Sequence, residues 1–417
     1  MMVVRWLVVV ILFPLVVLLA AVMLLNDLLY LLLCRWWRRP PKAGPASETP
    51  NAGRASVVVL NWNGKELLAE CLPSVVEAVE HEGGEHELIV VDNGSTDGSL
   101  DLLRERFPRV RVVALDKNYY FGGGNNAGAR AASNDIVVFL NNDMRVDKGF
   151  LRPLLEPFSS DDVFAVSSQI FFEDPGKPRE ETGKTRAQWR RGLIDYRHEA
   201  PAEADGGSNL PPIFWMGGGS SAVDRRKFLE LGGFDPLYHP FYVEDTDVSY
   251  QAWKRGWRIL FCPESRVIHK HRASSSRFGR DFVERTISRN QLLFIWKSVT
   301  EVRYLPTHLA FLPLTYLHLA RRHGALGAAR VVVAATARLP QALYRRNRLR
   351  RWHRRSDAEV FRVANDPFLY KQQYVPPRQV RRGEALKLLF TCPYLPSETH
   401  FGGEQMLSLL RGLSQRH

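Results

Sequence analysis

Short apolar runs alternate with helix-like stretches between residues 56 and 140 of this 417-residue chain. The stretches between the runs, residues 65–80, 99–107 and 127–132, favour helices. The runs themselves are rich in β-branched residues, as buried strands are, and occupy residues 56–60, 87–91, 110–114 and 136–140. This alternation predicts an α/β fold with a Rossmann-like, mainly parallel sheet and helices on both faces.

Polar side chains stand where the predicted strands end. Ligands of such sheets bind at the carboxyl ends of the strands, so we expect a site near Asn61, Asp92, Asn118 and Asp143. The glycine-asparagine loop of residues 121–128 would let backbone approach a ligand, and the helix after it would offer its N-terminus to a phosphate. We therefore add Gly123 and Asn126 of this loop to the residues expected to bind a phosphate-bearing ligand, which would be the donor in a transfer reaction.

Asn141-Asn142-Asp143 is the first acidic feature, at the end of the fourth run. When a group is transferred from a nucleoside diphosphate, negative charge builds up on the departing diphosphate. Mg²⁺ or Mn²⁺ neutralises such charge through oxygen ligands. We expect Asp143 and Asn141 to bind this metal and Asn142 to bind the donor. Ordinary turn chemistry at a strand end is the alternative for this motif.

Asp92 opens a second strand-end loop, residues 92–97. Its carboxylate can accept the imide N–H of uracil or thymine, or a ribose hydroxyl, so a nucleoside diphosphate donor of the UDP or dTDP type is expected. An Asx turn with helix capping by Ser95 or Thr96 is compatible with the same residues.

The second acidic feature is the tetrad Glu244-Asp245-Thr246-Asp247, placed before a helix predicted over residues 248–255. An acceptor hydroxyl needs a base within hydrogen-bond reach, and Asp245 is the candidate, with Glu244 orienting the acceptor or the base. Acids favoured by the helix dipole are the alternative, and they suffice to explain Asp247.

Two further features complete the predicted site. His269 can ligate a metal through neutral imidazole, whereas His271 would point the other way along a strand and is the weaker candidate. Trp215 and Gly218 belong to an aromatic and glycine-rich segment that precedes the acidic tetrad, and we expect them to contact the acceptor.

Residues 3–33 are almost entirely apolar, and roughly 20 apolar residues suffice to span a bilayer. Positive charge gathers after this stretch, at Arg35, Arg38, Arg39 and Lys42. The positive-inside rule then predicts a single-pass protein of the inner (cytoplasmic) membrane whose catalytic domain faces the cytoplasm. A buried helix of a soluble protein is the alternative.

The chain carries a formal charge of +13, and residues 345–355 hold seven arginines and no acid. Such a block suits membrane lipids or nucleic acid, and the apolar N-terminus favours lipid; a solvated helix face is the alternative. Residues 290–344 mix apolar runs with cations, which predicts interfacial helices or, alternatively, core helices. We expect no nucleic-acid partner and, from four scattered cysteines, no disulfide framework.

Composition divides the chain into six predicted segments. They are an anchor (1–34), a linker (35–54), a catalytic domain (55–289), a basic helical region (290–355), a second linker (356–385) and a fresh β-loop-α start (386–417). Within the catalytic domain, residues 173–212 are polar and rich in Pro and Gly, and they are expected to form a long loop.

Six segments, in this order, resemble motifs of the family 2 glycosyltransferases with the GT-A fold, especially the bacterial rhamnosyltransferase-like branch. They are VVVLNWNG (57–64), VVDNGSTDGS (90–99), NYYFGGGNNAG (118–128), FLNNDM (139–144), GGFDPLYHPFYVEDTDVSYQAWKRGW (232–257) and VIHKHRASS (267–275). Residues 386–417 are similar to the start of a GT-B, family 4 glycosyltransferase.

The resemblance implies an inverting transferase. Asp92 would contact the donor base, Asp143 would bind the metal with His269, and Asp245 would be the catalytic base. Asn141 departs from the family pattern, which has an acid there, so metal affinity would be low or supplied by other ligands. The Gln-x-x-Arg-Trp signature of processive synthases is absent from the sequence, which favours addition of one sugar.

The expected function is transfer of one sugar, rhamnose by the family branch, from a nucleoside diphosphate donor to a lipid-linked or cell-envelope glycan. A nucleotidyltransferase is one alternative, but no basic triphosphate loop follows the first strand. A catalytically inactive GT-A scaffold for envelope assembly is another, and a nucleic-acid binder is the least favoured.

Overall fold

The computed structural model describes residues 2–37, 49–174, 176, 180–207, 210–270 and 278–365. All of these belong to one compact unit, residues 1–370. His271 and the predicted GT-B start at 386–417 lie outside the described residues.

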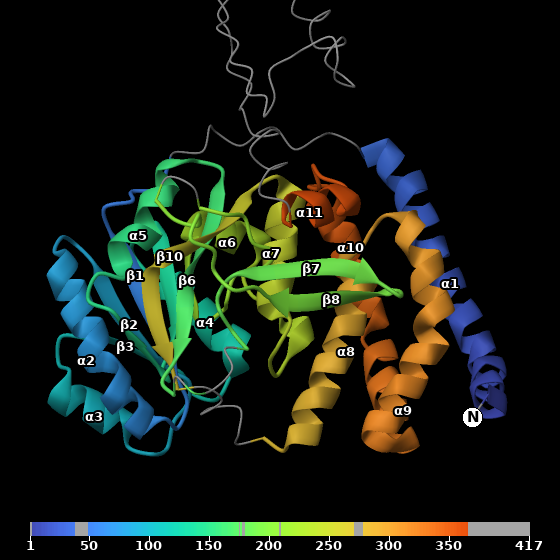
Figure 1. Ribbon diagram of the computed structural model, residues 1–417, viewed down its shortest axis with the longest axis horizontal. Coiled ribbons are helices and arrows are strands. Elements are labelled where there is room, and N and C mark those ends of the chain that lie inside the picture. Colours follow the sequence, from blue (N-terminus) through green and yellow to red (C-terminus); the bar gives the residue numbers. More distant parts are fainter. Residues whose placement is uncertain are drawn as a thin grey trace, which may run out of the picture. The chain divides into compact units, whose positions relative to one another are not determined.

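An eight-stranded sheet forms the centre of this unit, in the order β3-β2-β1-β4-β9-β6-β10-β5 (Figure 1). Strands β1 to β4 pair in parallel, as predicted, while β9 runs antiparallel between β4 and β6. The strand bounds are β1 (Ala55–Asn61), β2 (Glu87–Asp92), β3 (Arg111–Ala114), β4 (Ile136–Asn141), β5 (Met144–Val146), β6 (Val163–Phe172), β9 (Ser220–Asp224) and β10 (Arg258–His269). The α/β prediction is confirmed, with a mixed sheet.

Helices cover both faces of the sheet. One face packs α2 (Lys65–Glu82), α3 (Ser99–Arg106) and α5 (Leu151–Leu155). The other face packs α4 (Tyr120–Ala131), α6 (Arg225–Leu231) and α7 (Glu244–Arg255), as Figure 1 shows. Short 3₁₀ turns η1 (Glu156–Ser159), η2 (Pro236–Tyr238) and η4 (Val302–Tyr304) connect longer elements.

Helix α4 corrects the prediction of a glycine loop at residues 121–128, because the glycines lie inside the helix. A Cβ on Gly124 would overlap Leu60, and one on Gly128 would overlap Val58. The missing side chains therefore let α4 lie close against β1. Close helix–strand packing, rather than approach to a ligand, accounts for these two glycines.

The long loop predicted at residues 173–212 contains a hairpin instead, β7 (Thr185–Arg190) and β8 (Leu193–His198). Its turn residues Arg191 and Gly192 both have positive φ, 49° and 76°, as a two-residue type I′ turn requires. The hairpin tip packs against a following helix, where His308 Nδ1 lies 2.7 Å from the Gly192 carbonyl oxygen. The alternation typical of a half-buried strand is interrupted in β7, where Thr185, Arg186 and Ala187 are all buried.

The basic C-terminal part is helical, as predicted. It comprises α8 (Arg280–Ser298), α9 (Leu305–Thr336, broken at Gly324), α10 (Leu339–Arg350) and α11 (Asp357–Val363). Helix α8 packs on α7 and on both α9 and α10. Helix α11 lies in the segment predicted to start a linker, where Ser356 and Glu359 form a capping box.

The N-terminal apolar stretch forms α1 (Met2–Trp37), and within it Pro14–Leu33 is long and apolar enough to cross a membrane. Only 11% of that window is buried, which does not suit the alternative of a core helix. The more covered residues recur every three or four positions, a single helical stripe that contacts α9 and α10. They are Val16, Leu19, Ala20, Met23, Asn26, Asp27 and Tyr30.

Polar contacts fix this stripe. The Arg346 guanidinium of α10 donates to both Asp27 carboxylate oxygens, at 2.9 and 2.7 Å. The amides of Asn26 and Asn347 bond to each other. Arg346 also donates to the carbonyl oxygens of Trp296 and Val299 at the end of α8. Helix α1 is thereby bonded into the folded unit near its C-terminal end.

Candidate active site

A cavity of about 480 Å³ opens where β1 and β4 end and α7 begins. The hairpin, the loop before α7 and the first half of α8 close its other sides. Its lining includes Trp62, Asn93, Asn118, Asn141, Asn142, Asp143, Glu181, Tyr196, His198, Trp215, Gly218, Gly219, Phe241, Tyr242, Glu244, Asp245, His269 and Phe278.

Nine of the predicted site residues line this cavity: Asn118, Asn141, Asn142, Asp143, Trp215, Gly218, Glu244, Asp245 and His269. Four others, Asn61, Asp92, Gly123 and Asn126, are not among its lining residues. The structure thus brings together residues from strand ends, a helix start and a glycine run that are far apart in sequence.

Asn61 and Asp92 lie directly beneath the cavity floor, and both are buried. The Asn61 amide donates to Asp92 at 3.2 Å, and its carbonyl oxygen accepts from Asn142 Nδ2 at 2.7 Å. The Asp92 carboxylate also accepts from the Ser95 N–H, three residues on, at 2.9 Å, which closes the turn after β2. These bonds hold Asn142, which does line the cavity.

Asn126 occupies a structural position on α4. Its amide donates to the Phe234 carbonyl and accepts from the Phe234 N–H, both at 2.8 Å. Both ends of the Asn126 amide are therefore bonded to the backbone of Phe234. This placement does not fit the predicted contact between Asn126 and the sugar-nucleotide donor. Asn93, which was not predicted, faces the cavity instead and donates to Asn118 at 3.0 Å.

Asp143 and His269 meet across the ends of β4 and β10. Asp143 Oδ1 is buried, has no hydrogen-bond partner within the described part of the chain, and lies 3.4 Å from His269 Nε2. On the other side of the ring, His269 Nδ1 lies 3.2 Å from Glu181. Burial alone would lower the pKa of His269, but Asp143 and Glu181 raise it to about 9.

This arrangement fits a cation-binding site. A buried carboxylate oxygen faces an imidazole nitrogen, and Glu181 holds the opposite ring nitrogen as outer carboxylates do for metal-bound histidines. The described residues contain no group of three or more His, Cys, Asp or Glu side chains that could hold a metal ion unaided. A metal here would therefore need further ligands from its substrate.

Gly219 explains how Asn141 is positioned. A Cβ on Gly219 would overlap the Asn141 side chain, so that position has no room for a larger residue. The Asn141 N–H also donates to the Gly219 carbonyl at 2.9 Å. The glycine run therefore packs against the first residue of the acidic strand-end motif.

Glu244 and Asp245 form the first turn of α7, which begins four residues earlier than predicted. Burial raises the pKa of Asp245 to about 6, while N–H groups of Thr246 and Gly218 partly offset this rise. Burial and then the charge of Asp245 raise the pKa of Glu244 to about 8. Both shifts favour a proton on the pair, and the larger rise at Glu244 means that Glu244 holds it more readily than Asp245 does.

Strained backbone presents this pair to the cavity. Tyr242 and Val243, just before α7, have φ values of 69° and 79°, which cost non-glycine residues on the order of 1–3 kcal/mol each. Asn290 of α8 holds the loop, because its buried amide lies 2.7 to 3.0 Å from the carbonyl oxygens of Tyr238, Phe241 and Tyr242. No local signal in the sequence points to this contact.

The hairpin contributes a wall that the sequence analysis missed. Tyr196 and His198 of β8 pack edge-on against Trp215, with ring centroids 5.6 and 5.3 Å apart. On the opposite side of the cavity, Phe278 packs against Trp62 and Phe241. The alternation of more buried and more exposed residues along β8, from Ile194 to His198, is the signal that would have found the hairpin wall.

Comparison with known proteins agrees with the motif resemblance. Residues 56–229 match the family model described as Glycosyl transferase family 2. The chain is 32% identical over 197 residues to polypeptide N-acetylgalactosaminyltransferase 10 of Mus musculus, covering 45% of this chain and 32% of that protein. It therefore spans about a third of that relative's length.

The chain is also similar to a mycobacterial transferase in sequence and to a solved transferase structure. N-acetylglucosaminyl-diphospho-decaprenol L-rhamnosyltransferase of Mycobacterium tuberculosis (strain ATCC 25618 / H37Rv) is 26% identical over 221 residues, covering 46% of this chain and 68% of that protein. The crystal structure of GalNAc-T7 with UDP, GalNAc and Mn²⁺ superposes with a TM-score of 0.49 at 21% identity, covering 69% of this chain and 58% of that one.

The family match covers β1 to α6, which includes the ends of β1, β2 and β4 and the acidic strand-end motif. The mixed sheet with helices on both faces agrees with the α/β architecture expected from the sequence. The part of the chain that builds these strand ends is thus similar to glycosyl transferase family 2, and the cavity there is the candidate active site.

Proposed function

We propose that this chain is an inverting glycosyltransferase that moves one sugar from a nucleoside diphosphate-sugar to a lipid-linked or cell-envelope glycan. The observation that carries the proposal is a single cavity lined by Asp245 on one side and by Asp143 with His269 on the other. Asp245 can accept a proton from an acceptor hydroxyl, and Asp143 with His269 can bind the metal ion that accompanies a diphosphate.

Donor binding is assigned to the strand ends. Asn118 and Asn142 line the cavity and offer amide contacts, while Asp92 and Asn61 support them from below. Asp143, His269 and Asn141 are the proposed metal ligands, completed by diphosphate oxygens. Mg²⁺ or Mn²⁺ bound there would neutralise the charge that develops on the departing diphosphate.

Asp245 is the proposed general base. As the acceptor oxygen bonds to the anomeric carbon and the bond to the diphosphate breaks, Asp245 takes the hydroxyl proton. Its raised pKa favours this role, because a carboxylate near its own pKa accepts a proton readily. Glu244, buried beside it, orients the base, and Trp215 with Gly218 flanks the acceptor hydroxyl.

Rhamnose on dTDP is the donor sugar we propose first. The motif resemblance to the rhamnosyltransferase-like branch supports it, as does the similarity to a mycobacterial rhamnosyltransferase. We also propose that α1 anchors the enzyme in the inner membrane, with the catalytic domain on the cytoplasmic side. Deleting residues 1–39 should release the protein from membranes, and full retention would assign anchoring to the C-terminal helices instead.

Release of nucleoside diphosphate from a panel of nucleotide sugars tests the reaction. The detergent-solubilised full chain would receive Mg²⁺ or Mn²⁺ and a crude lipid acceptor extract, with Asp245→Asn run in parallel. Acceptor-dependent release from one donor, lost in the variant, would establish the transferase and name its sugar. Nucleotide binding without release from any donor would favour an inactive scaffold.

A further inference from the structure

A second cavity, of about 460 Å³, lies at the C-terminal end of the apolar span of α1. Tyr30 and Leu31 of α1 form one side of it. The end of α10 and the segment after it form another, through Arg350, His353 and Arg355. The loop between α8 and η4 closes the rest. The family match, residues 56–229, includes none of these lining residues.

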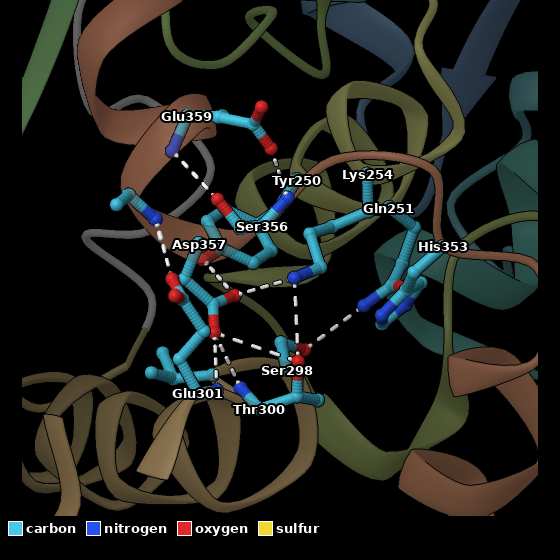
Figure 2. A network of polar contacts seen from close by, with 12 residues as sticks. Tyr250, Gln251, Lys254, Ser298, Thr300, Glu301, His353, Ser356, Asp357 and Glu359 are labelled. Atoms are coloured by element: carbon cyan, nitrogen blue, oxygen red, sulfur yellow. Dashed lines mark hydrogen bonds and ion pairs between the residues drawn. The ribbon is translucent and has the colours of Figure 1, made fainter. Parts of the chain in front are cut away.

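A buried polar network, shown in Figure 2, includes the cavity-lining residues Lys254, Thr300 and Glu301. The fully buried Asp357 carboxylate accepts from Tyr250 and Lys254 on one oxygen, at 2.6 and 2.8 Å. Its other oxygen accepts from the N–H groups of Thr300 and Glu301, at 2.7 and 2.6 Å. This single carboxylate ties α7, the loop after α8 and the start of α11 together.

The cavity is basic. Lys254, Arg303, Arg350 and Arg355 line it together with one carboxylate, Glu301. Asp357 and Asp27 stand behind this wall, where they pair with Lys254 and Arg350 at 2.8 and 3.1 Å. The carboxylates therefore hold the cations in place from behind, while the cationic groups line the opening.

Two arginines of the wall are paired on one side and still reach the solvent. Arg350 pairs with Asp27 through Nη1, and 18% of its side chain is exposed. Arg303 lies 3.3 Å from Glu301, and 57% of its side chain is exposed. Guanidinium groups that remain accessible in this way can donate charge-assisted hydrogen bonds to an anionic oxygen.

An apolar surface continues from the cavity along α1. Leu31 lines the cavity and is 49% exposed, and its neighbours Leu28 and Leu32 are 52% and 57% exposed on the outward face. A free phosphate ion would use the basic wall alone. A molecule with an anionic head and an apolar tail would use both surfaces, which is the chemistry of a phospholipid at a membrane interface.

We propose that this cavity binds the phosphodiester headgroup of an anionic phospholipid, with its acyl chains along the outward face of α1. The site lies at the cytoplasmic end of the proposed membrane span, where anionic headgroups occur. It is distinct from the catalytic cavity, because no residue lines both cavities. The inference rests on the proposed placement of α1 but not on sugar transfer.

A binding titration tests this site without any activity readout. The full chain in neutral detergent would be titrated with dihexanoyl phosphatidylglycerol, and the midpoint of thermal unfolding would report binding. We expect a saturable rise, with half-saturation at least about tenfold tighter than for dihexanoyl phosphatidylcholine or inorganic phosphate. Arg303→Gln should weaken it about tenfold, the scale of one lost hydrogen bond to a charged group.

Arg348→Gln is the matched control, because Arg348 is exposed on α10 and does not line the cavity. It should leave the titration unchanged. Arg350→Gln is a second wall variant, on the same helix as the control. Equal shifts with both lipids, or equal weakening by Arg303→Gln and Arg348→Gln, would overturn the site. Inorganic phosphate binding as tightly as phosphatidylglycerol would overturn the lipid assignment.

Discussion

Asp245 and Asp247 lie two residues apart on α7 and have opposite surroundings. Asp247 is buried and saturated: Tyr238 and Ser298 donate to one oxygen at 3.0 and 2.8 Å, and Lys297 to the other at 2.5 Å. Asp245 borders the catalytic cavity, and apart from its own N–H and that of Gly218 it takes bonds from the adjacent Thr246. One carboxylate is fixed by ion pairing, and the other keeps its capacity for a proton.

The different hydrogen bonding of Asp245 and Asp247 shows that acid residues within one helical turn can have two different roles. A carboxylate whose oxygens are all occupied stabilises the fold and has nothing left for a substrate. A partly satisfied, desolvated carboxylate costs stability but can exchange a proton near neutral pH. Burial alone does not distinguish the two uses, whereas the completeness of hydrogen bonding does.

Asp247→Ala should produce the largest change in stability. Removing one partner of a buried ion pair typically costs about 3–5 kcal/mol, and in the described part of the chain Lys297 would then keep only Asp235, at 2.7 Å, as its counter-ion. Chemical denaturation of the detergent-solubilised chain would measure the free energy of unfolding. A loss below about 1 kcal/mol, the range of an ordinary surface substitution, would contradict the ion-pair account.

Asp245→Asn should lower turnover strongly and leave stability nearly unchanged. Turnover should fall by at least about 10²-fold, the scale of lost general-base catalysis. The free energy of unfolding should stay equal or rise slightly at neutral pH, because the raised pKa of Asp245 means that its ionised form is disfavoured in the folded state. Turnover close to wild type would remove Asp245 from the base role.

Asn290→Ala tests the support of the strained loop. Three carbonyls would lose their common donor, so we expect turnover about tenfold lower and a stability loss of about 1–3 kcal/mol. Asn290→Asp, whose side chain cannot donate a hydrogen bond when ionised, should lower turnover as much as Asn290→Ala does. Ser288→Ala, on the same helix, should change neither turnover nor stability. An unchanged nucleotide KM beside the reduced kcat would identify Asn290 as a positioning residue; normal turnover in Asn290→Asp would refute it.

The pH profile should show the smallest effect. Asp245 must be ionised to act as a base, and its raised pKa of about 6 lies within reach of assay conditions. Turnover should therefore rise with pH through about 6 and then level, falling about tenfold per unit below that value. A profile flat down to pH 5 would place the titrating base elsewhere.

The parallel strands and their helices were predictable because each strand is a local run of β-branched residues. The two acidic features and His269 were predictable as chemistry, but their meeting depends on how β4, β10 and α7 pack. Asn290 could not be predicted, since it acts on carbonyls about 50 residues away in sequence. Asn126 and the α4 glycines were misassigned because their packing partners come from distant segments.

The bond between Arg346 and Asp27 has a practical consequence for protein engineering. A chain shortened to start after α1 would lose a tether and also the carboxylate that balances a guanidinium only 4% exposed. Such a chain would carry an uncompensated charge next to the end of α8. Pairing the deletion with Arg346→Met would replace that charge by an apolar side chain of similar length, which is the sounder route to a soluble catalytic domain.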